Sequence, residues 1–208
     1  GRLQMMRAVL FVFLLPLAGC GGGLLAPSGP APALYTLKAP QRVESAGPAV
    51  GWQLLVDVPA AQLALDSTRI AIAPAPDRID YYADVAWADR APALLQSVVV
   101  EAFERYGRIQ AVQRQGGGLH ADILLTMNLD DFEVDAAAAT VRVRFTAKLV
   151  RMKDRAIVAA RDFQAEAPVG GGGFAGVVAA FNHAVDDILP DLVTWTLGQG
   201  GRNLASKS

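Results

Sequence analysis

The strongest constraint on the fold is the alternation of apolar and polar residues in the second half of the chain. Apolar side chains occupy every second position over Ile123–Leu129 and again over Val141–Leu149. The segment Ile157–Ala165 alternates less regularly, which is typical of a strand with a bulge. Alternation of period two predicts strands with one buried face, and the short connections at 135–139 and 153–155 favour hairpins. These three segments therefore predict an antiparallel meander.

Two helical segments flank this meander in the sequence. The first begins near Pro92, places apolar residues on one stripe over Leu94–Tyr106, and ends at Gly107, a residue typical of helix C-termini. The second repeats apolar residues at helical spacing over Phe174–Trp195. Pro190 lies inside it and is expected to kink or restart the helix, because proline removes a backbone hydrogen bond.

Four shorter segments rich in strand-forming residues complete the predicted domain. They are Gln53–Val58, Arg69–Ala73, Ile79–Trp87 and Ile109–Arg114. Two main helices covering one face of a mixed, mainly antiparallel sheet make a two-layer α+β domain, which we expect to occupy residues 51–198. Residues 199–208 are expected to form a flexible tail.

The start of the chain has the features of an export signal. Arg2 and Arg7 supply positive charge, and the apolar run AVLFVFLLPL that follows is too short to span a bilayer. The next residues, Leu17–Cys20, are typical of the lipobox at which bacterial lipoproteins are cleaved and acylated on the cysteine thiol. We therefore expect residues 1–19 to be a lipoprotein signal peptide and Cys20 to carry the lipid. A plain signal peptide that contains a cysteine, or a buried apolar strand, is the alternative.

Residues 20–50 are rich in Gly, Pro and Ala, a composition that predicts a flexible tether between the lipid and the domain. Within them Leu34–Leu37 is an apolar island, which is either a chance occurrence or a short strand or docking segment. The acyl chains would attach the protein to a membrane of a Gram-negative cell envelope, facing the periplasm. Because Gly21 rather than aspartate follows the cysteine, we expect the outer membrane more than the inner one.

Composition argues against several function classes. The chain has 19 Lys and Arg against 20 Asp and Glu, which does not suit a nucleic-acid binder that relies on a positive field. His183, Asp186 and Asp187 could share a helix surface, and we interpret them as a solvated face rather than a weak metal site. The run Gly170–Gly173 lacks the Lys-Ser/Thr pair of a phosphate-binding loop. We therefore expect no catalytic residue, no cofactor and no metal.

Three aromatic residues form the candidate partner interface. Tyr81, Tyr82 and Trp87 lie within seven residues and are flanked by aspartates, as in an apolar patch with a polar rim. The same residues could instead be part of the core. The pattern leaves this choice open for the tyrosines and leans toward the core for the tryptophan.

Basic side chains mark the polar face of one predicted strand. Arg142, Arg144 and Lys148 recur at even spacing and could bind an anionic lipid head group. Pairing across the sheet with Asp122 and Asp130 on the neighbouring strand is the interpretation we favour, because a hairpin centred near residue 137 would place Arg144 opposite Asp130.

With these features in view, the chain resembles the ABC-type transport auxiliary lipoproteins. The resemblance rests on the lipobox, on Leu34–Leu37, on the blocks Arg69–Asp84 and Trp87–Pro92, and on the C-terminal run Ala180–Leu197. These proteins are accessory subunits encoded beside ABC transporters that carry an MCE (mammalian cell entry) substrate-binding subunit.

The resemblance implies a non-catalytic lipoprotein subunit in the transport of phospholipid or another hydrophobic substrate. Its implied partners are the MCE-domain protein and the ABC permease and ATPase, and its implied fold is a small α/β periplasmic type. The same order of anchor, tether and domain would also serve an envelope-assembly lipoprotein or one that activates a cell-wall synthase, and this remains the alternative.

Overall fold

The structure, a computed structural model, describes residues 30–39, 49–116 and 120–205. The predicted signal peptide, Cys20 and most of the predicted tether lie outside these ranges. The described residues from Ala31 onward form one compact unit.

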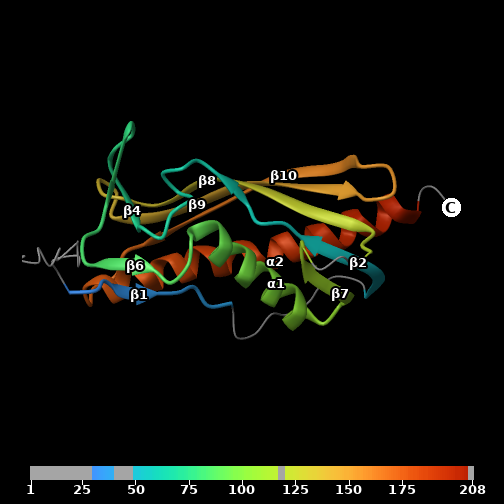
Figure 1. Cartoon of the computed structure of the whole chain (residues 1–208), viewed down its shortest axis with the longest axis horizontal. Coiled ribbons are helices and arrows are strands. Elements are labelled where there is room, and N and C mark those ends of the chain that lie inside the picture. The colour runs from blue at the N-terminus through green and yellow to red at the C-terminus, as the bar shows by residue number, and fades with distance from the viewer. Residues whose placement is uncertain (1–29, 40–48, 117–119, 206–208) are drawn as a thin grey trace, which may run out of the picture. The chain divides into compact units, whose positions relative to one another are not determined.

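Within the described residues, the main sheet has eight strands, and its central path runs β10-β9-β8-β2-β7 (Figure 1). The strands are β2 (Val50–Val56), β3 (Ala60–Ala61), β4 (Ala71–Ala75), β5 (Arg78–Tyr81), β7 (Ile109–Arg114), β8 (Ile123–Asp135), β9 (Thr140–Arg151) and β10 (Ala156–Pro168). The strands β8, β9 and β10 form the predicted antiparallel meander. Along the other edge of β8, the strands β2, β3 and β4 pair with it in turn, all parallel to it. The sheet is therefore mixed.

The alternating sequence pattern explains which face of the meander is buried. The odd-numbered residues of β9 from Val141 to Leu149 are at most 1% exposed, and their partners on β8 are buried as well. The register of β10 shifts between Ile157 and Ala159, which confirms the predicted bulge. An extra residue there explains why the alternation of this segment is irregular.

Two helices cover the sheet: α2 (Phe174–Ala205) packs against β9 and β10, and α1 (Ala91–Tyr106) packs against β7, β2 and α2 (Figure 1). The helix α1 has proline in its first turn and ends at Gly107, whose φ of 60° is the left-handed conformation that glycine adopts readily. The helix α2 continues through Pro190 as a single helix. The predicted flexible tail is therefore wrong over residues 199–205. Side chains on both sides of the proline are buried, and this tertiary packing outweighs the unfavourable effect of proline inside a helix.

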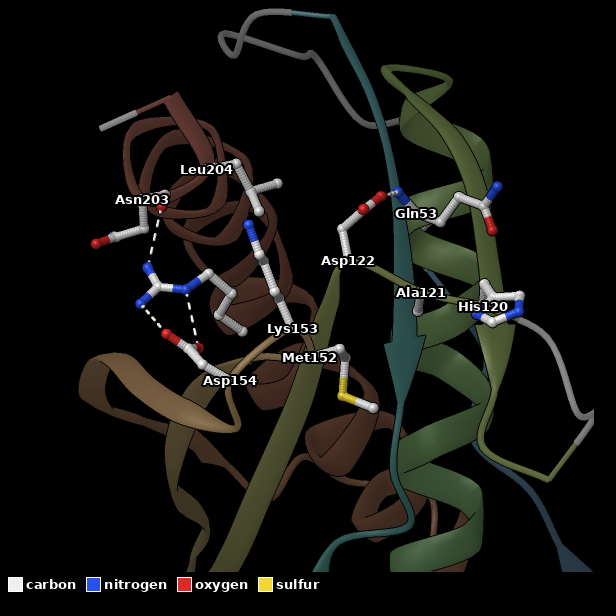
Figure 2. Close-up of a pocket in the computed structure, with 10 residues that line it drawn as sticks. Gln53, His120, Ala121, Asp122, Met152, Lys153, Asp154, Asn203 and Leu204 are labelled. Atoms are coloured by element: carbon white, nitrogen blue, oxygen red, sulfur yellow. Dashed lines mark hydrogen bonds and ion pairs between the residues drawn. The ribbon is translucent and has the colours of Figure 1, made fainter. Parts of the chain in front are cut away.

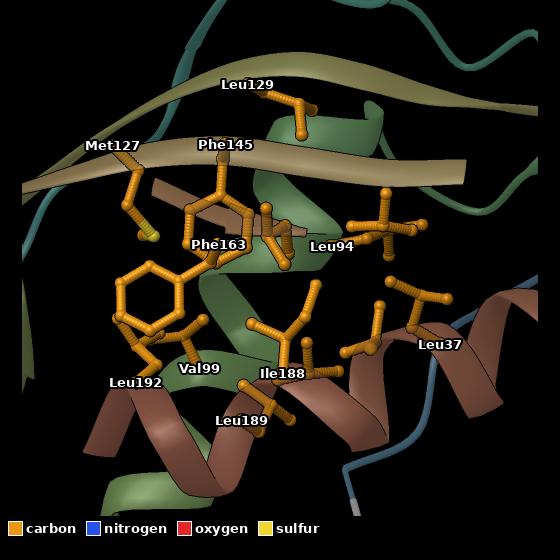
Figure 3. Packing of buried hydrophobic residues seen from close by; sticks show 14 of the residues in the cluster. Leu37, Leu94, Val99, Met127, Leu129, Phe145, Phe163, Ile188, Leu189 and Leu192 are labelled. Carbon is orange, nitrogen blue, oxygen red and sulfur yellow. The ribbon is translucent and has the colours of Figure 1, made fainter. Parts of the chain in front are cut away.

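The core lies between the helices and the sheet. Figure 3 shows side chains from α1, α2, the meander and the N-terminal segment meeting in one cluster. The largest fully buried side chains in it are Trp87, Phe103, Phe132, Phe145 and Phe181. Two helices on a mixed sheet confirm the predicted α+β class.

The N-terminal part of the described chain departs from the predicted tether. Residues 33–35 form β1 (Ala33–Tyr35), which pairs in parallel with β6 (Val85–Trp87). Leu37 and Ala39 are 6% and 4% exposed. We call residues 31–39 the strap. The boundary predicted at residue 50 is wrong for this segment, because Leu34–Leu37 finds partners far along the sequence that composition does not reveal.

The segment predicted as one strand over Ile79–Trp87 is two strands. β5 ends at Tyr81, and β6 begins at Val85 in the second, two-stranded sheet. Asp84, in the turn between them, has a φ of 60°. This left-handed residue turns the chain away from β4 and toward the strap.

Candidate functional site

Three aromatic rings from distant parts of the sequence meet at one end of the fold. The ring centroids of Tyr35 and Phe174 are 5.0 Å apart, and those of Tyr82 and Phe174 are also 5.0 Å apart, in an edge-on arrangement. We call these three residues the aromatic cluster. Each is partly exposed, and burial raises the pKa of the Tyr82 phenol. The cluster joins the strap, the turn after β5 and the start of α2 into one surface.

The structure separates the three residues of the predicted partner interface. Trp87 is 1% exposed and packs against Phe132 and Phe181, at centroid distances of 5.8 and 5.1 Å. Its assignment to an interface is therefore wrong, because β6 turns this side chain inward. Tyr81 and Tyr82 keep partly exposed side chains, and their interface role stays a prediction.

Tyr81 is held in place by two contacts. Its hydroxyl donates a hydrogen bond to the carbonyl oxygen of Ala64, 3.2 Å away. The guanidinium of Arg69 lies 3.6 Å from the centre of its ring, within the range of a cation–π interaction. Both contacts fix the ring against the fold, so this tyrosine is less available to a partner than Tyr82.

Sequence reasoning missed Tyr35 and Phe174 as members of the site. Phe174 directly follows the glycine run that precedes α2, and Tyr35 lies in the apolar island of the strap. A glycine run beside an aromatic residue was a usable signal, but nothing in the local sequence indicates that the two rings meet.

A glycine loop without charged side chains leads into Phe174 of the aromatic cluster, and an alanine turn lies beside this loop. The loop residues Gly170–Gly173 are exposed, and so are the four alanines of the β8–β9 turn, Ala136–Ala139. The two loops are joined, because the backbone N–H of Val169 donates to the carbonyl oxygen of Ala139 at 2.9 Å. Asp135 closes the alanine turn by accepting hydrogen bonds from two turn N–H groups, and these bonds hold the pKa of its carboxyl below the usual value.

The basic residues on the open face of the sheet are paired with acids. Arg142 contacts Glu133 at 2.7 Å and Asp135 at 3.1 Å. Arg144 contacts Asp131 at 2.7 Å and Asp130 at 3.8 Å. The closer partner is the residue after the predicted one, because the register of β8 shifts between positions 129 and 131.

The other acid predicted to pair with this basic face, Asp122, has a different partner. The carboxylate of Asp122 accepts the backbone N–H of Gln53 at 2.8 Å. Lys148 lies opposite Thr126 rather than an acid. Asp122 lies before the start of β8, so it is not the cross-strand neighbour of Lys148.

A cavity of about 790 Å³ lies at the other end of the meander, where β9 ends (Figure 2). Its lining combines both charge signs with apolar side chains: Gln53, His120, Ala121, Asp122, Arg151, Met152, Lys153, Asp154, Asn203 and Leu204. Arg151 is 8% exposed, donates to Asp154 through two nitrogens, and also donates to the carbonyl oxygen of Asn203. The arginine thus links the β9–β10 turn to the end of α2, and its charge stabilises the fold.

The polar helix face predicted on α2 lies where the spacing places it. His183 and Asp187 are exposed, whereas Asp186 is partly buried and burial raises the pKa of its carboxyl. No group of three or more metal-ligating side chains occurs in the part of the chain that the structure describes. Neither described helix combines the length and apolar character that crossing a membrane requires.

Solved structures share this architecture. A protein from Xanthomonas campestris is 34% identical, matches 83% of this chain and 99% of its own, and superimposes with a TM-score of 0.78. A second solved structure, at 13% identity and a TM-score of 0.63, matches 79% of this chain and 97% of its own. The fold is therefore a recurrent α+β domain.

The family follows from the sequence comparison. The family model described as "ABC-type transport auxiliary lipoprotein component" matches residues 35–193, and the chain belongs to this family. The resemblance inferred from the sequence is thus confirmed. The family is associated with ABC transport systems and consists of lipoproteins, which are envelope-associated proteins.

A related protein of Bradyrhizobium diazoefficiens is 30% identical over 164 residues. The match covers 78% of this chain and 44% of that protein, so the chain spans less than half the length of this relative.

Proposed function

We propose that the chain is a non-catalytic lipoprotein subunit of an MCE-type ABC transport system, which moves phospholipid or another hydrophobic substrate. The observation that carries this proposal is the family match over residues 35–193, which covers α1, the whole meander and α2 as far as residue 193. In this view the ATPase supplies the energy, the MCE-domain protein holds the substrate, and this chain acts through protein contacts at the periplasmic side of the envelope.

Cys20 is the proposed lipidation site. It follows the lipobox directly and is the single cysteine of the chain. Mass spectrometry of the protein from native membranes is expected to show an N-terminal, acylated Cys20. The Cys20→Ser variant is expected to stay unprocessed or to become soluble, and to fail to complement a deletion strain. A processed protein without fatty acid on this sulfur contradicts the anchor.

Capture from native membranes tests the transport assignment. The full chain with a C-terminal tag, expressed at its normal level, should recover an MCE-domain protein and an ABC permease and ATPase. A strain that carries the Cys20→Ser variant is the matched control for binding that depends on the anchor. Recovery of a cell-wall synthase or an outer-membrane assembly protein in place of transporter subunits would contradict the proposal and favour the alternative function.

Separation of inner and outer membranes tests the location. Because Gly21 follows the acylated cysteine, we propose that the protein fractionates with the outer membrane. A protein found in the inner-membrane fraction would contradict this part of the proposal and leave the transport assignment intact.

A further inference from the structure

We infer that the end of the fold that carries the aromatic cluster rests on the lipid bilayer that holds the protein's own anchor. The inference rests on the proposed lipidation of Cys20. The ligand is a membrane surface, and the contact is made by Leu34, Tyr35, Tyr82 and Phe174 together with the uncharged loops beside them.

The position at which the folded unit begins sets how far the domain can move from its anchor. Ten residues, Gly21 to Pro30, separate the lipidation site from the strap. Even fully extended, they span at most about 40 Å, whereas a tether that continued to residue 50 could span about 100 Å. The surface around Ala31 therefore has to lie within about 40 Å of the acylated residue.

The strap cannot lengthen this connection without breaking native contacts. The N–H of Ala33 donates to the carbonyl oxygen of Asp84 at 3.0 Å, and the N–H of Lys38 donates to the side-chain oxygen of Asn182 at 2.9 Å. Leu37 and Ala39 are buried in the core. The chain therefore leaves the fold at a fixed point beside the aromatic cluster.

The chemistry of this surface suits the boundary between lipid head groups and acyl chains. Leu34 is 66% exposed, and tyrosine side chains favour this boundary because their rings are apolar and their hydroxyls are polar. Gly170–Gly173 and Ala136–Ala139 add exposed backbone and small side chains without charge. The backbone carbonyl oxygen of Asp84 accepts the N–H of Ala33, the residue before Leu34, so an acidic residue adjoins this surface and we expect no preference for anionic lipid.

The opposite end of β9 carries charged side chains, so the two ends of the fold differ in polarity. β9 begins beside the alanine turn and ends at the cavity, where Asp122, Lys153 and Asp154 carry charge. Twelve residues of strand separate the two ends by about 40 Å. A domain that rests on lipid through the aromatic cluster would point this charged end away from the membrane.

The short tether favours a lipid bilayer as the partner of this surface. The anchor guarantees lipid within reach of this surface, and a short tether gives an effective concentration in the millimolar range, so that weak contacts suffice. Few exposed apolar side chains are needed for such a contact.

Single labels, one on the strap and one beside the cavity, test the inference. Acylation of Cys20 blocks its thiol, so that Leu34→Cys and the matched control Lys153→Cys each offer one reactive cysteine. The full lipidated chain with a fluorophore at either position is reconstituted in vesicles of phosphatidylethanolamine and phosphatidylglycerol that contain a nitroxide-labelled lipid. The label at position 34 is expected to lose most of its fluorescence, and the label at 153 is expected to keep it.

Equal quenching at both positions, or quenching at neither, would overturn the inference. Absence of quenching at position 34 would leave a membrane-embedded protein as the partner of this surface. Flotation with the vesicles and the mass of the acylated chain are measured on the same samples. A protein that floats without quenching contradicts the inference alone, whereas an unacylated protein contradicts the proposed function and the inference together. Because Leu34 is largely exposed, thermal melts of the variants should match the parent protein.

Discussion

Replacement of Gly176 by alanine tests how the glycine loop is seated beside the aromatic cluster. A Cβ atom at this position would lie 2.4 Å from the carbonyl oxygen of Gly170 and 2.8 Å from that of Gly171. Ordinary contacts begin at 3.4 Å, so the loop backbone would have to retreat by 1.0 Å, the difference between 3.4 and 2.4 Å. Both contacting atoms belong to the backbone and cannot move away by rotating a side chain.

The expected cost follows from two opposing effects. Forcing an extra methyl group into a packed site costs about 1–3 kcal/mol. Alanine in place of glycine in a helix returns up to about 1 kcal/mol. We therefore expect Gly176→Ala to lower the free energy of unfolding by about 1–2 kcal/mol, and the melting temperature by about 2–8 °C.

Gly171→Ala is the matched control in the same loop. Nothing lies within 4 Å of its Cβ position, and its φ is not in the left-handed range. Alanine there restricts the unfolded chain and should leave stability unchanged or raise it by up to about 1 kcal/mol. Urea denaturation followed by tryptophan fluorescence measures both variants. If Gly176→Ala is as stable as Gly171→Ala, the packing of the loop on α2 described above is wrong.

Four further substitutions test other parts of the structure by equilibrium denaturation. Gly200→Ala would place a methyl group 2.5 Å from the ring of Trp52 and should destabilise the fold, whereas Gly201→Ala meets no atom within 4 Å and should stabilise it by about 1 kcal/mol. Trp87→Ala should cost about 3–5 kcal/mol, as expected of a core residue. Because burial raises the pKa of Asp186, the folded state binds its proton more tightly than the unfolded state does, so Asp186→Asn should be stabilising at neutral pH and its advantage should shrink as the pH falls toward the raised pKa.

Local patterns in the sequence were sufficient to predict the meander and α1. The alternating residues Ile123–Leu129 of β8 and Val141–Leu149 of β9 lie within long strands, and the hairpins between the strands are short. The helix α1 has its proline and its terminal glycine at the expected positions. In these segments the local preference and the tertiary packing agree, which is why pattern alone was enough.

Residues whose position depends on distant partners could not be placed in this way. Leu37 is buried because the strap packs against α1 and α2, with hydrogen bonds from Arg105 to Ala39 and from Lys38 to Asn182. Trp87 is buried because Asp84 turns the chain before it. The partner of Arg144 changed because the register of β8 shifts by one residue. Side chains from three separate segments make the aromatic cluster, so no single stretch of sequence contains it.

A variant that loses function reports a lost contact with a partner only if the substituted residue does not also stabilise the fold. Arg142 is engaged with Glu133, which is 6% exposed, so Arg142→Ala would leave a buried carboxylate without its partner and cost about 1–3 kcal/mol or more. A loss of transport in that variant would therefore reflect a weakened fold. Leu34 contributes little to the stability of the fold, since 66% of its surface is exposed. A charged substitution there that abolishes transport while the melting temperature is unchanged would instead identify a surface that works by contact.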